Sequence, residues 1–363
     1  MRRTAPSPPR PARAKRPLAD KIDAAFAAAI AGHASGKFAV AVSGGSDSLA
    51  LMHLLAAHAQ AARRAPPIVL TVDHGLRKGS ARDAAQVLAW AKALGLEAHR
   101  LAWRGTKPAS GIEAAAREAR YRLMGAWLKK NRIGTLFVAH TQDDQAETFL
   151  LRLARGSGLD GLAAMRAFSP WPLPGFEELR LSRPLLGFGR AELRAFLERR
   201  DQAWLDDPMN DDPRFDRVKF RRAAALLADA GLTAARIADA AAHLARAREA
   251  LEAATEAVLL RACRAGRAGE GILLDPAALA AAPRELGLRA LARLLMQVGN
   301  KPYRPRFDSL ERLFGNIAAG TLSGGVTLHG CRIAPAAARL RVFGPQTLEI
   351  VPESSRNSVR AKG

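Results

Sequence analysis

Cysteine is almost absent from this chain of 363 residues, which contains only Cys263 and Cys331. The two lie far apart, and neither belongs to a Cys-x-x-Cys pair or stands near a pair of histidines. These spacings argue against a zinc site and against a disulfide framework. Sparse cysteine is typical of the reducing cytoplasm, so a cytoplasmic location is expected.

Long apolar runs are also absent. No uninterrupted apolar stretch approaches the length that a bilayer requires, so we expect no membrane-spanning segment. The N-terminal sequence MRRTAPSPPRPARAKRP is basic and rich in proline, and the alanine-rich segment after it follows Asp20, Lys21 and Asp23. That order predicts a first helix rather than a signal peptide. Residues 1–19 are predicted to form a disordered basic tail.

Acidic residues are scarce relative to basic ones. The chain has 34 Asp and Glu against 56 Lys and Arg, which gives a formal net charge of +22. Such an excess indicates a polyanionic partner, and nucleic acid is favoured over an acidic membrane because no basic amphipathic helix stands out. A generally basic protein with solvated arginines is the alternative.

The first half of the chain alternates between strand-like and helix-like segments. Strands are expected at residues 38–43, 68–73, 97–103 and 134–139, and helices at residues 48–60, 80–94, about 110–130 and after 141. Two of the helices are expected to open with capping boxes, formed by Ser110 with Glu113 and by Thr141 with Asp144. Strands separated by helices of this length pair in parallel, so the fold class is α/β with a doubly wound parallel sheet.

The alternation fades beyond about residue 155. Residues 180–200 predict an extended piece and then a helix, and residues 233–260 predict a helix with one buried seam of Ile237, Leu244, Leu251 and Val258. A further helix is expected at 283–298, followed by strand character at 321–344. These patterns indicate a C-terminal, mainly helical domain with a small β element. The expected divisions are a catalytic domain at 20–225, the helical domain at 226–345 and a polar tail at 346–363.

Polar residues collect where the expected strands end. Ligands on doubly wound sheets bind at the carboxyl ends of the strands, so this clustering indicates a site. The residues concerned are Ser43, Gly44, Gly45, Ser46, Asp47 and Ser48 after the first strand, Asp73 and His74 after the second, and His140, Asp143, Asp144 and Glu147 after the fourth.

The loop after the first strand has the composition of an anion-binding turn. Backbone N–H groups at a glycine-bearing strand-to-helix turn can wrap an anion, and Gly44 and Gly45 allow close approach of the main chain. The chain lacks the lysine of a Walker P-loop. Asp47 would repel phosphate unless Mg²⁺ or a cationic substrate lay between them. A tight turn capped by a Ser or Asp side chain is the alternative.

This loop resembles the signature of the PP-loop ATP pyrophosphatases, which cleave ATP between the α- and β-phosphates. The resemblance implies a PP-loop (HUP-like) fold and the adenylation of an acceptor, with AMP and pyrophosphate as products. The superfamily contains GMP, NAD, asparagine and argininosuccinate synthetases, tRNA thiolases and tRNA(Ile)-lysidine synthetases.

The sequence HTQDDQAETFLLRLARGSGLDGL at residues 140–162 resembles the motif of the last of these families. That motif is His, two residues, Asp-Asp-Gln, one residue and Glu-Thr, followed by Arg-Gly-Ser-Gly. VDHGLR (72–77) and AAREARY (115–121) are also similar to family segments. Residues 207–221 resemble a further family element, with Met209 and Val218 as departures from it. The resemblance is strong over about 36–225 and thin beyond.

The resemblance implies a role for each matching residue. ATP would be bound by Ser43 to Ser48 with Asp73 and His74, and lysine or Mg²⁺ by Asp143, Asp144 and Glu147. Asp47, Arg120, His140, Asp144 and Glu147 would be catalytic, with Arg120 and His140 at the cytidine. Mg²⁺ would be held by Asp47 and Asp143, and tRNA by Arg155, Arg217 and Arg221.

The acidic trio Asp143, Asp144 and Glu147 also has a physical argument of its own. The three lie within one helical turn, so their carboxylates can converge on one cation. Desolvating the ε-ammonium of free lysine without carboxylate partners would be costly. The alternative is that acidic residues simply favour the first turn of a helix. The division of labour among the three acids is open.

Cysteine usage and charge separate the members of the superfamily. tRNA thiolases depend on cysteines in or near the catalytic domain, and no cysteine occurs between residues 1 and 262. The excess of basic residues fits an RNA substrate better than a small metabolite. The resemblance then implies ligation of free L-lysine to C2 of the wobble cytidine of a CAU-anticodon tRNA(Ile), and a homodimer. A metabolite synthetase and a non-catalytic RNA-binding protein remain as alternatives.

Overall fold

The computed structural model describes residues 18–31, 36–77, 79–108, 110–206, 223–224, 226–266 and 271–353. Most of the predicted N-terminal tail lies outside these ranges, but Leu18 and Ala19 already belong to helix α1 (Leu18–Ile30). The chain divides into two compact units, Met1–Ala245 and Arg246–Gly363. The point of division lies inside helix α9 (Ala234–Ala262), which is one continuous helix. The expected domain boundary at 225/226 stays a prediction.

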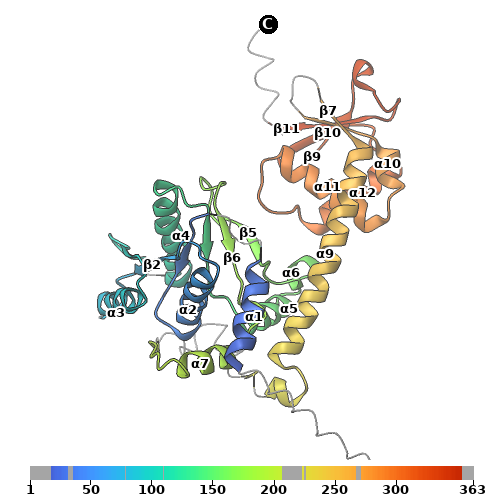
Figure 1. Ribbon diagram of the computed structural model, residues 1–363. Helices are drawn as coiled ribbons and strands as arrows, with labels where there is room; N and C mark the ends of the chain where they lie inside the picture. Colours follow the sequence, from blue (N-terminus) through green and yellow to red (C-terminus); the bar gives the residue numbers. More distant parts are fainter. Residues whose placement is uncertain are drawn as a thin grey trace, which may run out of the picture. The chain divides into compact units, whose positions relative to one another are not determined.

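The first unit is built on a six-stranded sheet with the order β3-β2-β1-β4-β6-β5 (Figure 1). Neighbouring strands from β3 to β6 pair in parallel, and β5 pairs antiparallel at the edge. The predicted doubly wound parallel sheet is therefore confirmed, with an additional, unpredicted strand at its edge. The strands are β1 (Ala39–Ala41), β2 (Ile68–Asp73), β3 (Ala98–Ala102), β4 (Thr135–Phe137), β5 (Phe168–Pro170) and β6 (Arg180–Ser182).

Alternate residues of the central strands enter two separate cores. Val40 and Phe137 pack in the core that also contains residues of α1, α2, α3 and α7. Ala39 and Leu136 pack in a second core, with residues of α4. Because side chains of a strand point alternately to opposite faces, both faces of the sheet are covered. The helices are α2 (Ser46–Ala61), α3 (Ser80–Ala93), α4 (Ile112–Lys130), α5 (Gln142–Ala154), α6 (Leu159–Leu162) and α7 (Arg190–Glu198).

One of the two expected capping boxes forms. At α5 the Thr141 hydroxyl accepts from the Asp144 N–H, while the Asp144 carboxylate accepts from the Thr141 N–H at 2.8 Å. The expected box of Ser110 and Glu113 is wrong, because α4 begins at Ile112 and its N-cap is Gly111. Gly111 has a φ of +63°, a left-handed conformation that starts the helix later than the Ser-x-x-Glu pattern predicts.

The second unit contains a five-stranded antiparallel sheet with the order β7-β8-β11-β10-β9. Helices α10 (Pro276–Ala280), α11 (Arg284–Val298) and α12 (Phe307–Ala318) contribute to the core of this unit together with Ile333 and Ile350. The expected helix at 283–298 is confirmed. The strands are β7 (Cys263–Ala265), β8 (Ile272–Leu274), β9 (Val326–Leu328), β10 (Cys331–Pro335) and β11 (Leu348–Pro352).

The predicted polar tail at 346–363 is wrong over residues 348–352, which form the central strand β11. Leu348 and Ile350 point into the core, with Ile350 fully buried. The strand is short and polar residues flank it in the sequence, so its two buried side chains gave only a weak indication of a strand. Residues 354–363 lie outside the described ranges.

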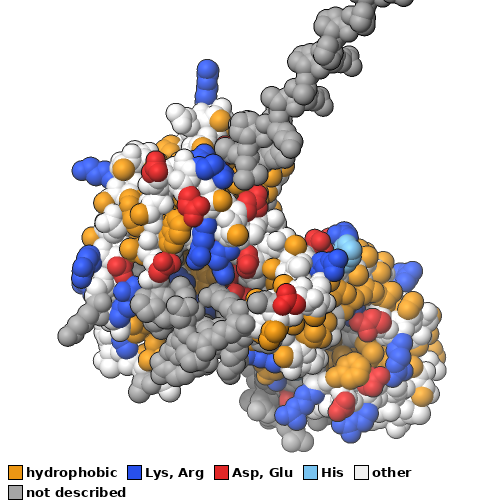
Figure 2. All heavy atoms as spheres, turned by 90° about the horizontal axis from the view of Figure 1, so that it is seen from below, with side chains coloured by type: hydrophobic (Ala, Val, Ile, Leu, Met, Phe, Trp, Pro, Cys, Tyr) orange, Lys and Arg blue, Asp and Glu red, His pale blue; other side chains and the backbone are white. Residues whose placement is uncertain are grey.

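The surface of the described chain carries charges of both signs. Figure 2 shows Lys and Arg side chains interspersed with Asp and Glu, with hydrophobic side chains between them. In the part of the chain that the structure covers, no helix combines the length and apolar character needed to cross a membrane.

Candidate active site

The loop between β1 and α2 is a compact turn built from its own serines. The Ser43 N–H donates to the Ser48 hydroxyl at 3.2 Å, and that hydroxyl donates to the Gly45 carbonyl at 2.9 Å. The N-cap of α2 is Gly45, and no side chain caps the helix. The expected alternative, a turn capped by a Ser or Asp side chain, is therefore not what forms. A helix N-terminus without a side-chain cap favours a bound anion.

The two glycines of this loop serve different purposes. Gly44 has a φ of +96°, and a Cβ there would lie 2.6 Å from Cδ1 of Leu205. The Leu205 N–H also donates to the Gly44 carbonyl at 2.9 Å, so the segment after α7 packs on the loop. A Cβ at Gly45 would have no neighbour closer than 3.8 Å, which is ordinary van der Waals contact, so the structure itself does not require glycine there.

The predicted acidic residues converge on one cation, the guanidinium of Arg190. Its Nε lies 3.1 Å from Oδ2 of Asp47, and its Nη2 lies 3.3 Å from Oδ1 of Asp144. Its Nη1 lies 3.8 Å from Oε1 of Glu147. The structure therefore brings the aspartate of the glycine loop and two acids of α5 to one place, as the sequence predicts.

Asp143, the fourth predicted acid, has a different task. Its Oδ2 accepts a hydrogen bond from the backbone N–H of Arg190 at 2.7 Å. Arg190 is the first residue of α7, so this carboxylate satisfies an N–H at the helix start and complements the helix dipole. Asp143 therefore positions the backbone of Arg190, while Asp144 and Glu147 contact its side chain.

Burial and charge act against each other in this cluster. Burial raises the pKa of Asp47 above its ordinary value, although the charge and hydrogen bond of Arg190 act to lower it. Burial acts to lower the pKa of Arg190, but the carboxylates of Asp47, Asp144 and Glu147 outweigh it and raise that pKa. The guanidinium is therefore charged at neutral pH, and Asp47 is a stronger base than an ordinary aspartate.

The carboxylates fit Mg²⁺ only with help from a ligand. Among the described residues, no group of three or more His, Cys, Asp or Glu side chains is arranged to hold a metal ion. Mg²⁺ is commonly bound by one or two carboxylates together with phosphate oxygens of a substrate. Asp47, which stands directly after the glycine loop, is placed for that shared coordination.

Asp73 and His74 shape the neighbouring strand end. Asp73 accepts from the Ser80 hydroxyl at 2.6 Å and from the Gly75 N–H at 3.1 Å, and it pairs with Arg100 at 3.0 Å. Burial would raise its pKa, but these donors and the charge of Arg100 together lower it. His74 Nδ1 accepts from the Leu76 N–H at 3.1 Å. Their role in binding ATP stays a prediction.

His140 is held by an arginine that the sequence patterns did not single out. The buried Arg183 donates from Nε to His140 Nδ1 at 3.2 Å, and from Nη1 to the Arg166 carbonyl and the Ser169 hydroxyl. Arginine can only donate, so His140 Nδ1 carries the lone pair, and a neutral ring then has its proton on Nε2. Burial lowers the pKa of Arg183.

The arginines predicted to act on RNA lie at the surface where the structure describes them. Arg120 is exposed on α4, whereas the charge of Arg117, one turn earlier, acts on Arg183. Arg155 is exposed at the end of α5. Arg217 and Arg221 lie outside the described residues. The assignments of these residues to cytidine and tRNA stay predictions.

Sequence reasoning missed Arg190, Arg183 and Leu205. A cluster of acids near a glycine loop needs a counter-ion, so a search for arginines at the starts of later helices would have found Arg190. Arg183 and Leu205 left no local signal, since their partners His140 and Gly44 are distant in the chain.

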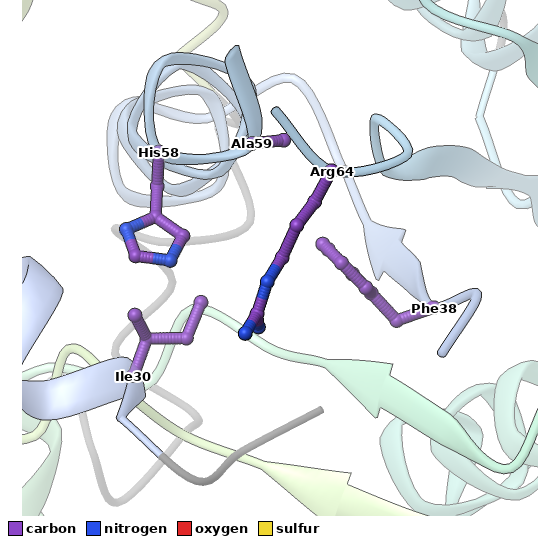
Figure 3. A pocket seen from close by; sticks show the side chains of 5 residues that line it. All are labelled: Ile30, Phe38, His58, Ala59 and Arg64. Atoms are coloured by element: carbon purple, nitrogen blue, oxygen red, sulfur yellow. The ribbon is translucent and has the colours of Figure 1, made fainter. Parts of the chain in front are cut away.

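A small pocket lies near the other end of α2 and does not belong to this site. Figure 3 shows it between Ile30, Phe38, His58, Ala59 and Arg64. Its volume of about 10 Å³ accommodates little more than one water molecule. It is therefore too small for a nucleotide.

A doubly wound sheet whose first strand runs into a glycine-bearing turn at a helix N-terminus occurs in several classes of nucleotide-binding α/β proteins. The PP-loop domain family matches residues 17–226. The U34-tRNA thiolase NcsA from Methanococcus maripaludis, solved with its [4Fe-4S] cluster, has a similar fold with a TM-score of 0.53. It is 15% identical, with 63% of this chain and 80% of that chain covered, so the likeness concerns the fold alone.

Relatives of known activity match far more closely in sequence. The chain is 41% identical over 336 residues to the tRNA(Ile)-lysidine synthase of a Methylobacterium species, covering 92% of this chain and 94% of the relative. It is 40% identical over 333 residues to that of a Bradyrhizobium species, covering 89% and 91%. The chain belongs to the tRNA(Ile)-lysidine synthase family, and the family predicted from residues 140–162 is confirmed.

Proposed function

We propose that the chain ligates free L-lysine to C2 of the wobble cytidine of a CAU-anticodon tRNA(Ile) in an ATP-dependent reaction. The observation that supports it best is the convergence of three acidic side chains beside the glycine loop. Asp47 stands in the first turn of α2, directly after the loop, and Asp144 and Glu147 of α5 contact the same guanidinium. A reaction between a nucleotide polyphosphate and an amino-acid ammonium needs both kinds of site side by side.

The reaction has two steps, adenylation of the cytidine and then displacement of AMP by lysine. The C2 oxygen of the cytidine attacks the α-phosphorus of ATP, and the bond to the β-phosphate oxygen breaks to release pyrophosphate. The ε-amine of lysine then attacks C2, and the C2–O bond breaks to release AMP. The modified base, lysidine, forms a pair with A in place of G. This changes the codon that is read from AUG to AUA and the tRNA's identity from methionine to isoleucine.

The chain's own residues bind and orient these groups. The backbone of the turn from Ser43 to Ser48 binds the phosphates, with Asp73 and His74 beside the nucleotide. Asp144 and Glu147 bind the lysine ammonium. His140, with its Nε2 proton, and Arg120 stabilise the polarised cytidine. Mg²⁺, when bound by Asp47 with Asp143 nearby, supplies positive charge for the leaving pyrophosphate.

The net positive charge of the chain supports tRNA as its macromolecular partner. A net charge of +22 supports an RNA substrate, with Arg155, Arg217 and Arg221 as phosphate contacts. A homodimer and a cytoplasmic location are part of the same proposal, the latter supported by the shortage of cysteine.

The test is incorporation of labelled lysine into acid-precipitable tRNA, with ATP and total bacterial tRNA. Counts are expected only with ATP and only in a CAU isoacceptor, with AMP as the nucleotide product. Asp47→Asn is expected to reduce the rate at least ~100-fold, while Asp239→Asn on the exposed side of α9 is the matched control. Formation of ADP, or AMP formation that needs no tRNA, would overturn the proposal in favour of a different ligase.

A further inference from the structure

The guanidinium of Arg190 occupies the place where a substrate cation is expected. Each of its three nitrogens faces a different carboxylate, from Asp47 at 3.1 Å, Asp144 at 3.3 Å and Glu147 at 3.8 Å. The side chain is 21% exposed, so it is largely withdrawn from water. An ammonium group that entered this cluster would compete with Arg190 for the same oxygens.

We propose that Arg190 is an internal stand-in for the lysine ammonium, which keeps the amino-acid site closed until a nucleotide polyphosphate on the neighbouring loop attracts the guanidinium. The inference rests on the proposed function, because it takes lysine and ATP as the ligands. It adds an order of binding, with nucleotide before lysine.

The position of α7 supports the second half of this inference. Arg190 contacts Asp47, which stands in the first turn of α2, and Arg194, one turn further along α7, has its Nε 3.5 Å from the Ser46 hydroxyl. Two arginines of one helix therefore face the anion loop. Arginine is well suited to phosphate because its planar group donates two parallel hydrogen bonds.

The backbone of Arg190 is held independently of its side chain. Its N–H donates to Asp143 at 2.7 Å and belongs to the first turn of α7. Movement of the guanidinium from carboxylates to phosphate therefore needs only rotations of the side chain, with the helix in place. Once it moves, Asp144 and Glu147 are available to the ammonium.

The experiment measures binding of L-lysine by calorimetry to the full chain without nucleotide. Arg190→Gln removes the competing cation, so it is expected to bind lysine about tenfold or more tightly than the wild type. Arg199→Gln is the matched control, since Arg199 is exposed at the C-terminal end of the same helix, and its lysine affinity is expected to equal that of the wild type. A merely structural role of Arg190 would weaken lysine binding.

The same titrations are repeated with a non-hydrolysable ATP analogue. The analogue is expected to tighten lysine binding by the wild type about tenfold or more, and to have little effect on Arg190→Gln, because the coupling passes through this residue. Unchanged or weaker lysine binding by a folded Arg190→Gln overturns the inference. If that variant does not fold, the absence of coupling in the wild type overturns it, and coupling supports it.

The two proposals fail in different ways. A wild-type protein that binds no lysine even with nucleotide and tRNA would contradict the proposed function itself. Lysine binding that is present but equal in wild type and Arg190→Gln would contradict only the stand-in role.

Discussion

The pKa values of two aspartates near neighbouring strand ends, Asp47 and Asp73, are shifted in opposite directions by their surroundings. Burial raises the pKa of Asp47, while Asp73, for which burial acts in the same sense, has its pKa lowered by Ser80, the Gly75 N–H and Arg100. The Asp73 carboxyl therefore stays ionised at neutral pH. Asp47 is the less acidic of the two.

The stabilisation by Asp73 is expected to depend on pH. Asp73→Asn should lower the free energy of unfolding at pH 7 by about 1–2 kcal/mol, since hydrogen bonds to a charged acceptor are weakened, and the half-exposed Arg100 adds little. A lowered folded-state pKa means that this stabilisation is complete above the unfolded pKa of about 3.9 and is lost as pH falls through the folded value. Urea unfolding at pH 7 and near pH 3 checks it. An equal difference at both pH values would contradict the assignment.

The two cysteines, taken as single residues, help to distinguish a tRNA(Ile)-lysidine synthase from a tRNA thiolase. Burial raises the pKa of Cys263 and of Cys331 to about 11. Both therefore remain protonated thiols at neutral pH, and a thiol is a poor nucleophile compared with a thiolate. Neither residue suits the persulfide chemistry of a thiolase, which agrees with the family that the relatives define.

At the scale of single elements, the active site depends on two loop-to-helix junctions. The turn before α2 needs glycine at position 44, where φ is +96° and a Cβ would lie 2.6 Å from Leu205. The junction before α5 uses Thr141 and Asp144 in a capping box, and it leaves Oδ1 of Asp144 facing Arg190. One carboxylate thus fixes a helix start with one oxygen and enters the charged cluster with the other.

The two glycines of the turn are expected to respond differently to alanine. Gly44→Ala combines a left-handed φ with a Cβ 2.6 Å from Leu205, so it should cost about 1–3 kcal/mol of stability. Gly45→Ala has a φ of −72° and no close neighbour, so it should leave the melting temperature nearly unchanged while weakening binding of an ATP analogue. Thermal unfolding and nucleotide titration of both variants separate the effects. Equal destabilisation by the two would show that the turn is not held as described.

For the whole molecule, charge is the property that connects the sequence to its substrate. The chain carries a formal net charge of +22, and in Figure 2 the Lys and Arg side chains of the described residues are interspersed with Asp and Glu and are not confined to one area of that view. Phosphate contacts release counter-ions, so binding through them depends steeply on salt.

The affinity for tRNA is therefore expected to fall by about 10³-fold between 50 and 200 mM salt if about six phosphates are contacted. Fluorescence titration of the full chain with labelled tRNA at several salt concentrations measures the slope. Titration of an ATP analogue under the same conditions is the control, with a much shallower expected dependence. A flat salt dependence for tRNA would contradict a role of the basic surface in RNA binding.

The sequence by itself determined what depends on residues close together in the chain. The alternation of strands and helices predicted the parallel sheet, with β2 at residues 68–73 as observed, and the motif at 140–162 identified the family. The capping box of α5 also followed from a four-residue pattern. Hydrophobic period and capping act over a few residues, and they are therefore legible without a fold.

Only the tertiary structure decided which distant residues meet. Arg190 bonds to Asp47 across 143 residues, and Arg183 bonds to His140 across 43. Local sequence patterns likewise did not predict the strand β11, because its cross-strand partners are set by the surrounding chain. They also did not predict that α4 starts only after the left-handed Gly111. A charge pair needs proximity in space, and no spacing rule along the chain encodes that proximity.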